Sequence, residues 1–202
     1  ENIGGDPTLA SRAALLAKAD LVSDMVLEFD KMQGIAGCYY ARNDGEPEEV
    51  ATAIKDQYLP KFAGDALPES KTACALALAD RLDTLVGIFG IGQPPTGSKD
   101  PFALRRASLG VLRIIVEKDL ALDLAPLIEK AKSLHSNLPK EGTVVADVLS
   151  YMIERFRAWY EEDNIPVQVF QAVSAKNITI PVDFDKRVKA VFAFNQLEES
   201  AA

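Results

Sequence analysis

Apolar residues recur at intervals of three and four positions along most of the chain, which is the spacing of amphipathic helices. The first clear start signal is Asp6-Pro7, where an acidic cap is followed by proline. Apolar positions continue from there at near-helical spacing as far as Val26. We therefore expect helix from Pro7 to about Val26, with Gly34 and Gly37 breaking the pattern beyond it.

Two further helices are marked by their ends. Pro47 lies among acidic residues, a composition that suits the first turn of a helix. This helix should run to about Tyr58 and stop at Pro60. Ser70 is placed to cap the next one, and the Ala- and Leu-rich stretch 73–89 predicts a central, buried helix.

Glycine and proline are dense over residues 90–97, and Asp100-Pro101 then signals a new helix. No pair of strand-like segments separated by a turn signal occurs. The chain therefore predicts an all-α fold of about eight helices, in one domain covering residues 1–202. The later helices are expected at 123–134, 143–161, 166–175 and 182–197.

Composition narrows the classes of protein to consider. The chain has 202 residues, a net charge of −8 and 48% apolar residues, enough for a real core. No run approaches the ~20 apolar residues of a membrane span. Cys38 and Cys74 are too few for a disulfide framework and indicate thiols in a reducing compartment. Because residues 1–5 resemble the end of a longer helix or a linker, we expect an excised piece of a larger protein.

Several catalytic classes find little support. His135 is the single histidine, which excludes multi-histidine metal sites and most zinc enzymes. It ends a polar helix, where an exposed histidine favourable to the helix dipole is the simpler interpretation than a catalytic base. The segment Gly87–Lys99 is not a phosphate-binding P-loop, because Ser98 precedes Lys99 and the preceding residues read as helix.

Two pairs of carboxylates remain as candidates for chemistry. Asp20 and Asp24 lie four apart on the expected first helix, and Asp80 and Asp83 lie three apart on the buried one. Such carboxylates could hold Mg²⁺ or Mn²⁺, which prefer oxygen ligands. They could equally be solvated edges or partners of neighbouring cations, namely Lys18 and Arg81.

A local basic stretch contrasts with the acidic chain. Residues 99–118 carry five Lys and Arg against two acids, whereas residues 42–69 carry three against seven. A basic stretch below a Gly/Pro loop can meet an RNA backbone. The alternative is that Arg105 or Arg106 pairs with a carboxylate at position 80, 83 or 100. The residues that we select as RNA candidates are Lys99, Arg105, Arg106 and Arg113.

Basic and aromatic residues also interleave between Arg155 and Tyr160, as on some RNA-stacking surfaces. At helical spacing, however, Phe156, Trp159 and Tyr160 share one face. We interpret that face as core.

The segment from Gly87 to Ile114 reads GIFGIGQPPTGSKDPFALRRASLGVLRI. It resembles a signature of the bacterial-type glycyl-tRNA synthetase beta subunit family, and its part Lys99–Arg106 is highly specific. The resemblance extends in order over nearly the whole chain, through Lys18–Val22, Tyr58–Asp65 and Phe156–Tyr160. Family members are several times longer, so this chain corresponds to a middle region.

That region of the family is similar to HD-type phosphohydrolases. Residues 79–83 look like the last metal-site motif of ppGpp hydrolases, and residues 14–20 are similar to the helix that carries the His-Asp pair. Here Ala19 precedes Asp20 where the motif has histidine, and residues 1–19 contain no histidine at all. The resemblance thus implies an HD-like helical fold whose hydrolase centre is lost, with Asp20 and Asp80 as capping or pairing groups.

The resemblance also implies a role. In the intact synthetase, glycine activation with ATP belongs to the alpha subunit, and the beta subunit serves tRNA recognition and assembly. We expect a non-catalytic, cytoplasmic piece that needs no cofactor of its own and helps to position tRNA(Gly). Its expected partners are tRNA(Gly), the alpha subunit and the remaining beta-subunit domains, with no membrane. Two alternatives remain, namely a scaffold domain that touches no RNA and a residual metal-dependent phosphohydrolase.

Overall fold

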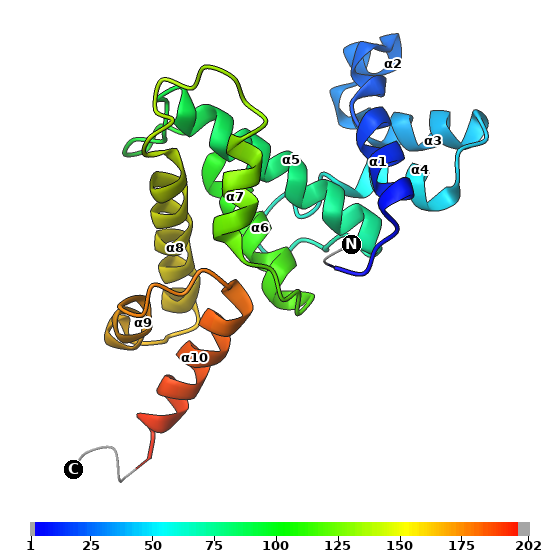
Figure 1. Ribbon diagram of the computed structural model, residues 1–202. Helices are drawn as coiled ribbons and strands as arrows, with labels where there is room; N and C mark the ends of the chain where they lie inside the picture. The colour runs from blue at the N-terminus through cyan, green and yellow to red at the C-terminus, as the bar shows by residue number, and fades with distance from the viewer. Residues whose placement is uncertain (1–2, 198–202) are drawn as a thin grey trace. The chain divides into compact units, whose positions relative to one another are not determined.

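The computed structural model describes residues 3–197, and this part of the chain is helical (Figure 1). Within it lie ten α-helices and two short 3₁₀-helices, with one isolated β-bridge between Thr96 and Lys99 and no strand. The all-α prediction is confirmed. Residues 1–2 of the expected linker lie outside the described range.

The chain forms two compact units, Glu1–Arg81 and Leu82–Ala202, which we call the N-terminal and C-terminal units. The boundary falls inside α5 (Lys71–Gly90), the predicted Ala- and Leu-rich helix. Apolar residues along α5 are buried as expected, from Ala73 to Phe89. The assignment of both units to one domain stays a prediction.

In the N-terminal unit, α1 (Pro7–Leu16) and α3 (Ile35–Asn43) both pack on α4 (Glu48–Asp56). The predicted start of α1 is confirmed, since the Asp6 carboxylate accepts hydrogen bonds from the backbone N–H groups of Thr8 and Leu9. The core of this unit consists of small and apolar residues, including Ala13, Cys38, Val50, Ile54, Ala73 and Leu76.

The prediction of continuous helix to Val26 is wrong. After α1 the chain forms the 3₁₀-helix η1 (Ala19–Val22), α2 (Asp24–Glu28) and the 3₁₀-helix η2 (Asp30–Met32). The break has a local cause at Ser23, whose backbone is extended and whose hydroxyl accepts from Val26 N–H at 3.4 Å. Serine favours such a cap over a helix interior, so apolar spacing alone overestimated the length.

Gly37 was expected to break a helix and instead lies inside α3. A Cβ at this position would lie 2.8 Å from Ile54 Cγ2 and 3.1 Å from the Asp20 carboxyl carbon. Gly37 is therefore explained by close packing rather than by chain reversal. Gly34, with φ +78°, makes the turn that precedes α3.

The buried Arg81 guanidinium ties α5 to the segment after α4. It donates to the carbonyl oxygens of Gln57 and Leu59, both at 2.8 Å, and to that of Ala77 at 3.0 Å. Burial lowers the pKa of Arg81, opposed by the negative charge of Asp80. Arg81 thus satisfies the backbone carbonyls of Gln57 and Leu59, which lie just beyond the end of α4.

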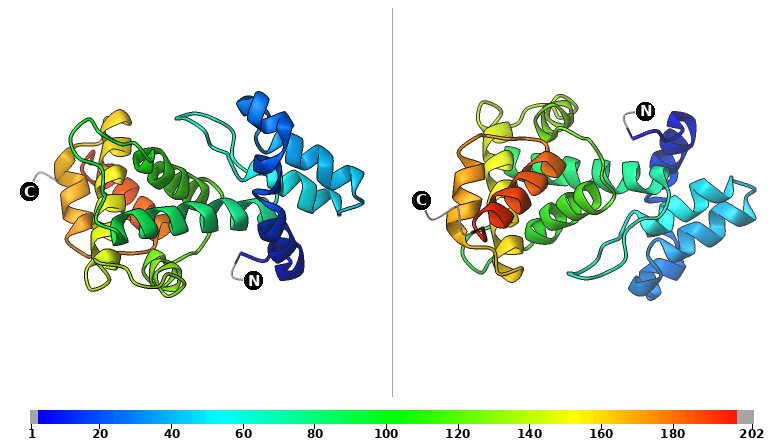
Figure 2. Two further views of the ribbon diagram at one scale, coloured as in Figure 1. Left: turned by 90° about the horizontal axis from the view of Figure 1, so that it is seen from above. Right: turned by 90° about the horizontal axis from the view of Figure 1, so that it is seen from below.

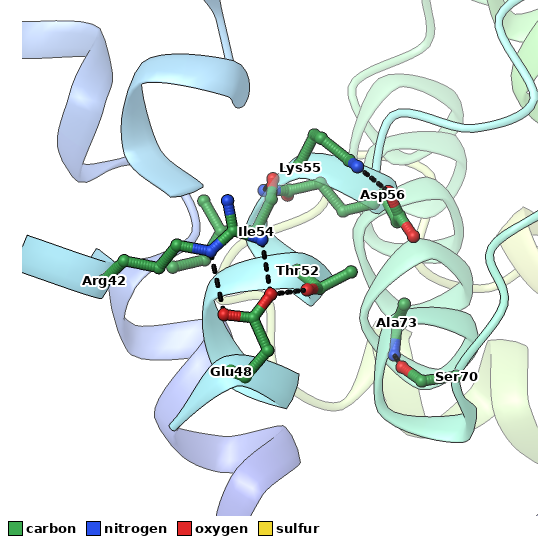
Figure 3. A network of polar contacts seen from close by, with 9 residues as sticks. Arg42, Glu48, Thr52, Ile54, Lys55, Asp56, Ser70 and Ala73 are labelled. Carbon is green, nitrogen blue, oxygen red and sulfur yellow. Dashed lines mark hydrogen bonds and ion pairs between the residues drawn. The ribbon is translucent and has the colours of Figure 1, made fainter. Parts of the chain in front are cut away.

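A solvent-exposed network joins α3 to α4 (Figure 3). Arg42 Nε donates to Glu48 at 2.8 Å, and the Thr52 hydroxyl donates to the same carboxylate at 3.0 Å. The hydrogen bond from Arg42, with that from Thr52, lowers the pKa of Glu48 to about 2. At the start of α5, Ser70 accepts from Ala73 N–H at 3.0 Å, which confirms the predicted cap.

The C-terminal unit contains α6 (Leu104–Glu117), α7 (Leu124–Lys132), α8 (Val144–Glu162), α9 (Val167–Ser174) and α10 (Pro181–Phe194). In this unit α8 packs against α6, α7 and α9, and α10 packs against α6 and α9 (Figure 2). The last four helices agree with the sequence prediction to within a few residues.

Aromatic rings fill the core of this unit. Phe156 lies 5.3 Å from Tyr160 and 5.4 Å from Phe184 between ring centroids, and Trp159 lies 5.5 Å from Phe156. Phe156 and Tyr160 are buried, which confirms the interpretation of this helix face as core. The Tyr160 hydroxyl donates to Asp185 at 3.1 Å, so its polar atom is also satisfied.

Candidate nucleic-acid interface

The basic candidates lie on a loop and on the start of α6, in the C-terminal unit. The prediction that a helix begins at Asp100-Pro101 is wrong. Asp100 lies four residues before the first residue of α6 and caps that helix with its side chain. Its carboxylate accepts from the backbone N–H groups of Leu104 at 2.8 Å and Arg105 at 3.0 Å. Helix α6 therefore starts at Leu104, and Phe102 lies before it with 43% of its surface exposed. The negative charge of a carboxylate also interacts favourably with the dipole at the N-terminus of a helix.

The loop before α6 is closed by a tight backbone pair. Thr96 and Lys99 exchange backbone hydrogen bonds of 3.1 and 2.8 Å around Gly97, which has φ +51°. The Arg105 guanidinium donates to the carbonyl oxygen of Gly97. Arg105 thus holds the loop against the helix, and this contact differs from the expected pairing with a carboxylate.

The four basic candidates are not equivalent. Arg113 pairs with Glu117 at 2.6 Å and its side chain is 11% exposed, so it is largely committed within its own helix. Lys99 and Arg106 are both exposed, and their side chains make no hydrogen bond or ion pair within residues 3–197. These two cations are free to meet a phosphate, whereas Arg105 positions the loop that carries Lys99.

An open groove lies in the same unit and has a volume of about 590 Å³. One wall is the face of α8 that carries Asp147, Tyr151 and Glu154, and the other comes from the end of α5 and the loop after it. Gly90 permits the close approach, because a Cβ there would lie 2.7 Å from Leu138 Cδ2. The full lining is Phe89, Gly92, Pro94, Lys140, Thr143, Asp147, Ser150, Tyr151 and Glu154.

The sequence prediction did not include this groove. A signal was present in the polar positions of α8, since residues 143, 147, 150, 151 and 154 recur at helical spacing opposite the core face. The other wall comes from a distant loop, which periodicity cannot place.

The carboxylate candidates serve other purposes. Asp20 is buried, and its Oδ2 accepts from Gly34 N–H at 2.6 Å and Gly37 N–H at 3.2 Å. Asp20 lies in η1 and Asp24 begins α2, so the prediction that they share one helix face is wrong. Asp24 is exposed.

The second carboxylate pair is likewise engaged. Asp80 pairs with Lys18 at 3.1 Å, one of the two cations that the sequence suggested as partners. Asp83 lies 2.9 Å from His135 Nε2, and the histidine side chain is 25% exposed. His135 is therefore a partner of Asp83 rather than a freely exposed helix end.

Within residues 3–197, no three His, Cys, Asp or Glu side chains come together as a metal site. Cys38 and Cys74 are buried free thiols, and burial raises the pKa of Cys38. Over the same residues, no helix has the length and apolar character needed to cross a membrane.

Comparison with known proteins agrees with the sequence resemblance. The family model described as glycyl-tRNA synthetase beta subunit matches residues 2–175. Over 200 residues the chain is 60% identical to the glycine–tRNA ligase beta subunit of Chromohalobacter salexigens, covering 99% of this chain. Identity is 58% with that of Marinobacter nauticus and 57% with that of Klebsiella pneumoniae, each over all 202 residues. The chain spans 29% of the length of each of these relatives. It belongs to the glycyl-tRNA synthetase beta subunit family.

Proposed function

We propose that this chain is a non-catalytic part of a glycine–tRNA ligase beta subunit and that it helps to bind and position tRNA(Gly). The observation that carries the proposal is the pair Lys99 and Arg106, exposed and without a partner in the described part of the chain. In the intact synthetase, aminoacylation with ATP would be carried out together with the alpha subunit. The HD-like character of the fold and a cytoplasmic location remain part of this proposal.

Phosphate contact is the chemistry that these residues offer. Exposed Lys and Arg neutralise backbone phosphates and release counterions, so they add affinity without reading sequence. Arg105 contributes indirectly by holding the Gly97 carbonyl, whereas Arg113 is committed to its pair with Glu117. The acidic stretch 42–69 of the N-terminal unit, with three Lys and Arg against seven acids, would repel RNA and leave binding to the C-terminal unit.

The test is a salt titration of binding between the chain and a tRNA(Gly) transcript, with a non-cognate tRNA alongside. The key variant is Lys99→Glu/Arg106→Glu. Loss of two phosphate contacts should reduce the slope of log K against log salt by about two, which is roughly tenfold in affinity over a fourfold change in salt. Arg105→Glu/Arg106→Glu should act similarly and also release the Gly97 loop.

The matched control is Lys31→Glu/Lys176→Glu, which changes the net charge by the same amount at two exposed lysines. The control should bind tRNA nearly as the unaltered chain does. Equal losses in both double variants would mean that only net charge matters. Absence of binding at low salt would contradict RNA contact by this chain.

A second candidate function is a scaffold within the larger assembly, and a specific observation favours it. Large apolar side chains between Leu15 and Phe29 are exposed, with Val22 at 85% and Leu27 at 71%. Apolar patches of this kind mark interaction surfaces. The relatives extend far beyond the length matched here, so other beta-subunit domains or the alpha subunit are available to cover it.

This candidate is tested in the complete beta subunit with Val22→Asp/Leu27→Asp. The scaffold function predicts loss of co-purifying alpha subunit or an altered, protease-sensitive beta subunit, with tRNA phosphate contacts unchanged. Normal assembly and protease resistance would exclude the patch as an interface.

A residual phosphohydrolase has no support among the described residues. Asp20 and Asp80 make the capping and pairing contacts given above, and no metal cluster forms in residues 3–197. Incubation with Mn²⁺ and phosphodiester or nucleotide substrates tests this alternative directly, and measurable turnover would revive it.

A further inference from the structure

The groove between α8 and the loop after α5 has the features of a site for a flat, neutral, hydrogen-bonding group. Its volume of about 590 Å³ lies in the range of small-molecule sites. Apolar and polar groups line it together: the Phe89 ring and Pro94 occur beside the hydroxyl groups of Thr143 and Ser150.

The apolar part is aromatic. The rings of Phe89 and Tyr151 lie 5.1 Å apart at 57°, and the Arg155 guanidinium lies 5.5 Å from the Tyr151 ring centroid. Phe89 is buried and supports the Tyr151 ring from within, so the half-buried Tyr151 and Arg155 supply the surface on which a nucleic-acid base can stack.

The polar part contains unused hydrogen-bonding capacity. The Tyr151 hydroxyl is shielded from solvent and has no partner within the described residues. Burial raises the pKa of Tyr151, so the group stays a protonated donor at neutral pH. A buried hydroxyl without a partner calls for an explanation, and a bound ligand supplies one.

The charges of the groove favour a base over a phosphate. Asp147 is exposed and its carboxylate makes no hydrogen bond or ion pair within residues 3–197. Glu154 is engaged by Arg157 at 2.9 Å, which leaves Asp147 as the available acceptor. A carboxylate repels phosphate but accepts well from an exocyclic amino group, such as N4 of cytosine.

The groove has one cation in its lining, Lys140, against the two carboxylates of Asp147 and Glu154. Lys140 is exposed, and α6 packs against α8, the helix that forms one wall of the groove. Lys99 and Arg106, the free cations, belong to the loop before α6 and to the start of that helix. Phosphates held there would flank a base inserted in the groove.

We infer that this groove binds an unpaired nucleotide of the RNA, with its base against the half-buried Tyr151 ring and an exocyclic amino group donating to Asp147. Cytosine and adenine carry such an amino group and uracil does not, so the groove should bind cytosine and adenine more tightly than uracil. This inference rests on the proposed function, because it assumes that the cations of this unit meet RNA.

The experiment measures binding of the 202-residue chain to short fluorescent oligonucleotides at low salt, comparing oligo(C) and oligo(A) with oligo(U). Oligo(C) and oligo(A) should bind several-fold more tightly than oligo(U). In Asp147→Asn this preference should shrink to about onefold, because an amide oxygen is a weaker acceptor and its N–H₂ favours a carbonyl. The matched control Glu162→Gln removes the same charge from an exposed position at the end of α8 and should keep the preference.

Tyr151→Phe separates binding from folding. Because the hydroxyl has no partner in the described residues, its loss should leave the melting temperature unchanged or raise it. Binding of oligo(C) should nevertheless weaken several-fold. A fall in melting temperature with unchanged binding would overturn the inference.

The remaining outcomes separate the two proposals. If Lys99→Glu/Arg106→Glu weakens binding while Asp147→Asn and Tyr151→Phe leave both affinity and base preference intact, the groove inference fails and phosphate contact stands. If neither set changes binding, both fail. Equal affinity of the unaltered chain for all three oligonucleotides also overturns the groove inference.

Discussion

Replacing Asp20 by alanine should destabilise the N-terminal unit strongly. The carboxylate is 2% exposed and accepts from two backbone N–H groups, those of Gly34 at 2.6 Å and Gly37 at 3.2 Å. Both groups belong to the start of α3, so Asp20 acts as a remote cap of that helix. Alanine leaves these donors buried and unsatisfied.

The magnitude follows from these contacts. A hydrogen bond to a charged group contributes about 1.5–3 kcal/mol, so two lost bonds give about 3–6 kcal/mol. The second carboxylate oxygen, Oδ1, is buried without a partner, and this offsets part of the gain. We therefore expect the lower end, about 3 kcal/mol, for Asp20→Ala. Asp20→Asn keeps one acceptor oxygen and should cost roughly half as much.

The assay is urea unfolding followed by circular dichroism, combined with hydrogen exchange at the Gly34 and Gly37 amides. With an m-value of about 2 kcal/mol/M, a loss of 3 kcal/mol lowers the midpoint by about 1.5 M. Exchange at both amides should accelerate markedly. Asp24→Ala is the matched control, since Asp24 is exposed, and its cost should stay below about 1 kcal/mol.

One result would refute the reasoning. If Asp20→Ala unfolds at the same urea concentration as the unaltered chain but loses a measurable affinity for Mn²⁺, Asp20 is a metal ligand and not a cap. The residual phosphohydrolase would then regain its main support.

Three further predictions concern the polar contacts that hold each unit. Arg81→Met should lower the free energy of unfolding by about 3 kcal/mol. Arg81→Lys should restore little of this stability, because one ammonium group cannot donate to carbonyl oxygens on separate segments. Urea unfolding of both variants checks this prediction. The pKa of Glu48 is lowered to about 2, so its pair with Arg42 stabilises the fold above pH 4.5, and this contribution is lost as the pH falls from there towards 2. The melting temperatures of Glu48→Gln and the unaltered chain should therefore differ at pH 6 and converge at pH 2, and a constant difference would contradict the assignment. Tyr160→Phe removes the hydrogen bond to Asp185 and should cost about 1 kcal/mol by thermal unfolding, whereas no loss would mean that the buried hydroxyl contributes nothing net.

The sequence by itself determined the helical class, most of the later helices and the family. Those features depend on local information: apolar spacing, the Asp6-Pro7 start, the Ser70 cap and the specific Lys99–Arg106 segment. The aromatic core face of α8 was also predictable, because Phe156 and Tyr160 share one side of a helix whatever they pack against.

Apolar spacing misjudged the backbone between residues 20 and 37, once for a local reason and once for a distant one. The local cap at Ser23 divides the helix expected to Val26, and Gly37 lies inside α3, where a Cβ would come too close to Ile54 and Asp20. The spacing of residues 20–37 does not predict that Ile54 of α4 lies against Gly37. Asp20 itself looks like a surface carboxylate or a metal ligand in the sequence, and only the fold shows that its oxygen caps α3.

The candidate interface divides in the same way. Charge counting selected Lys99, Arg105, Arg106 and Arg113 as equals, because composition weighs every cation alike. Only tertiary structure separates them, since pairing and exposure depend on which carbonyl or carboxylate lies within reach. The groove beside α8 is a still stronger case, because its two walls are far apart in sequence and are brought together only by the fold, as in the contact of the Phe89 and Tyr151 rings.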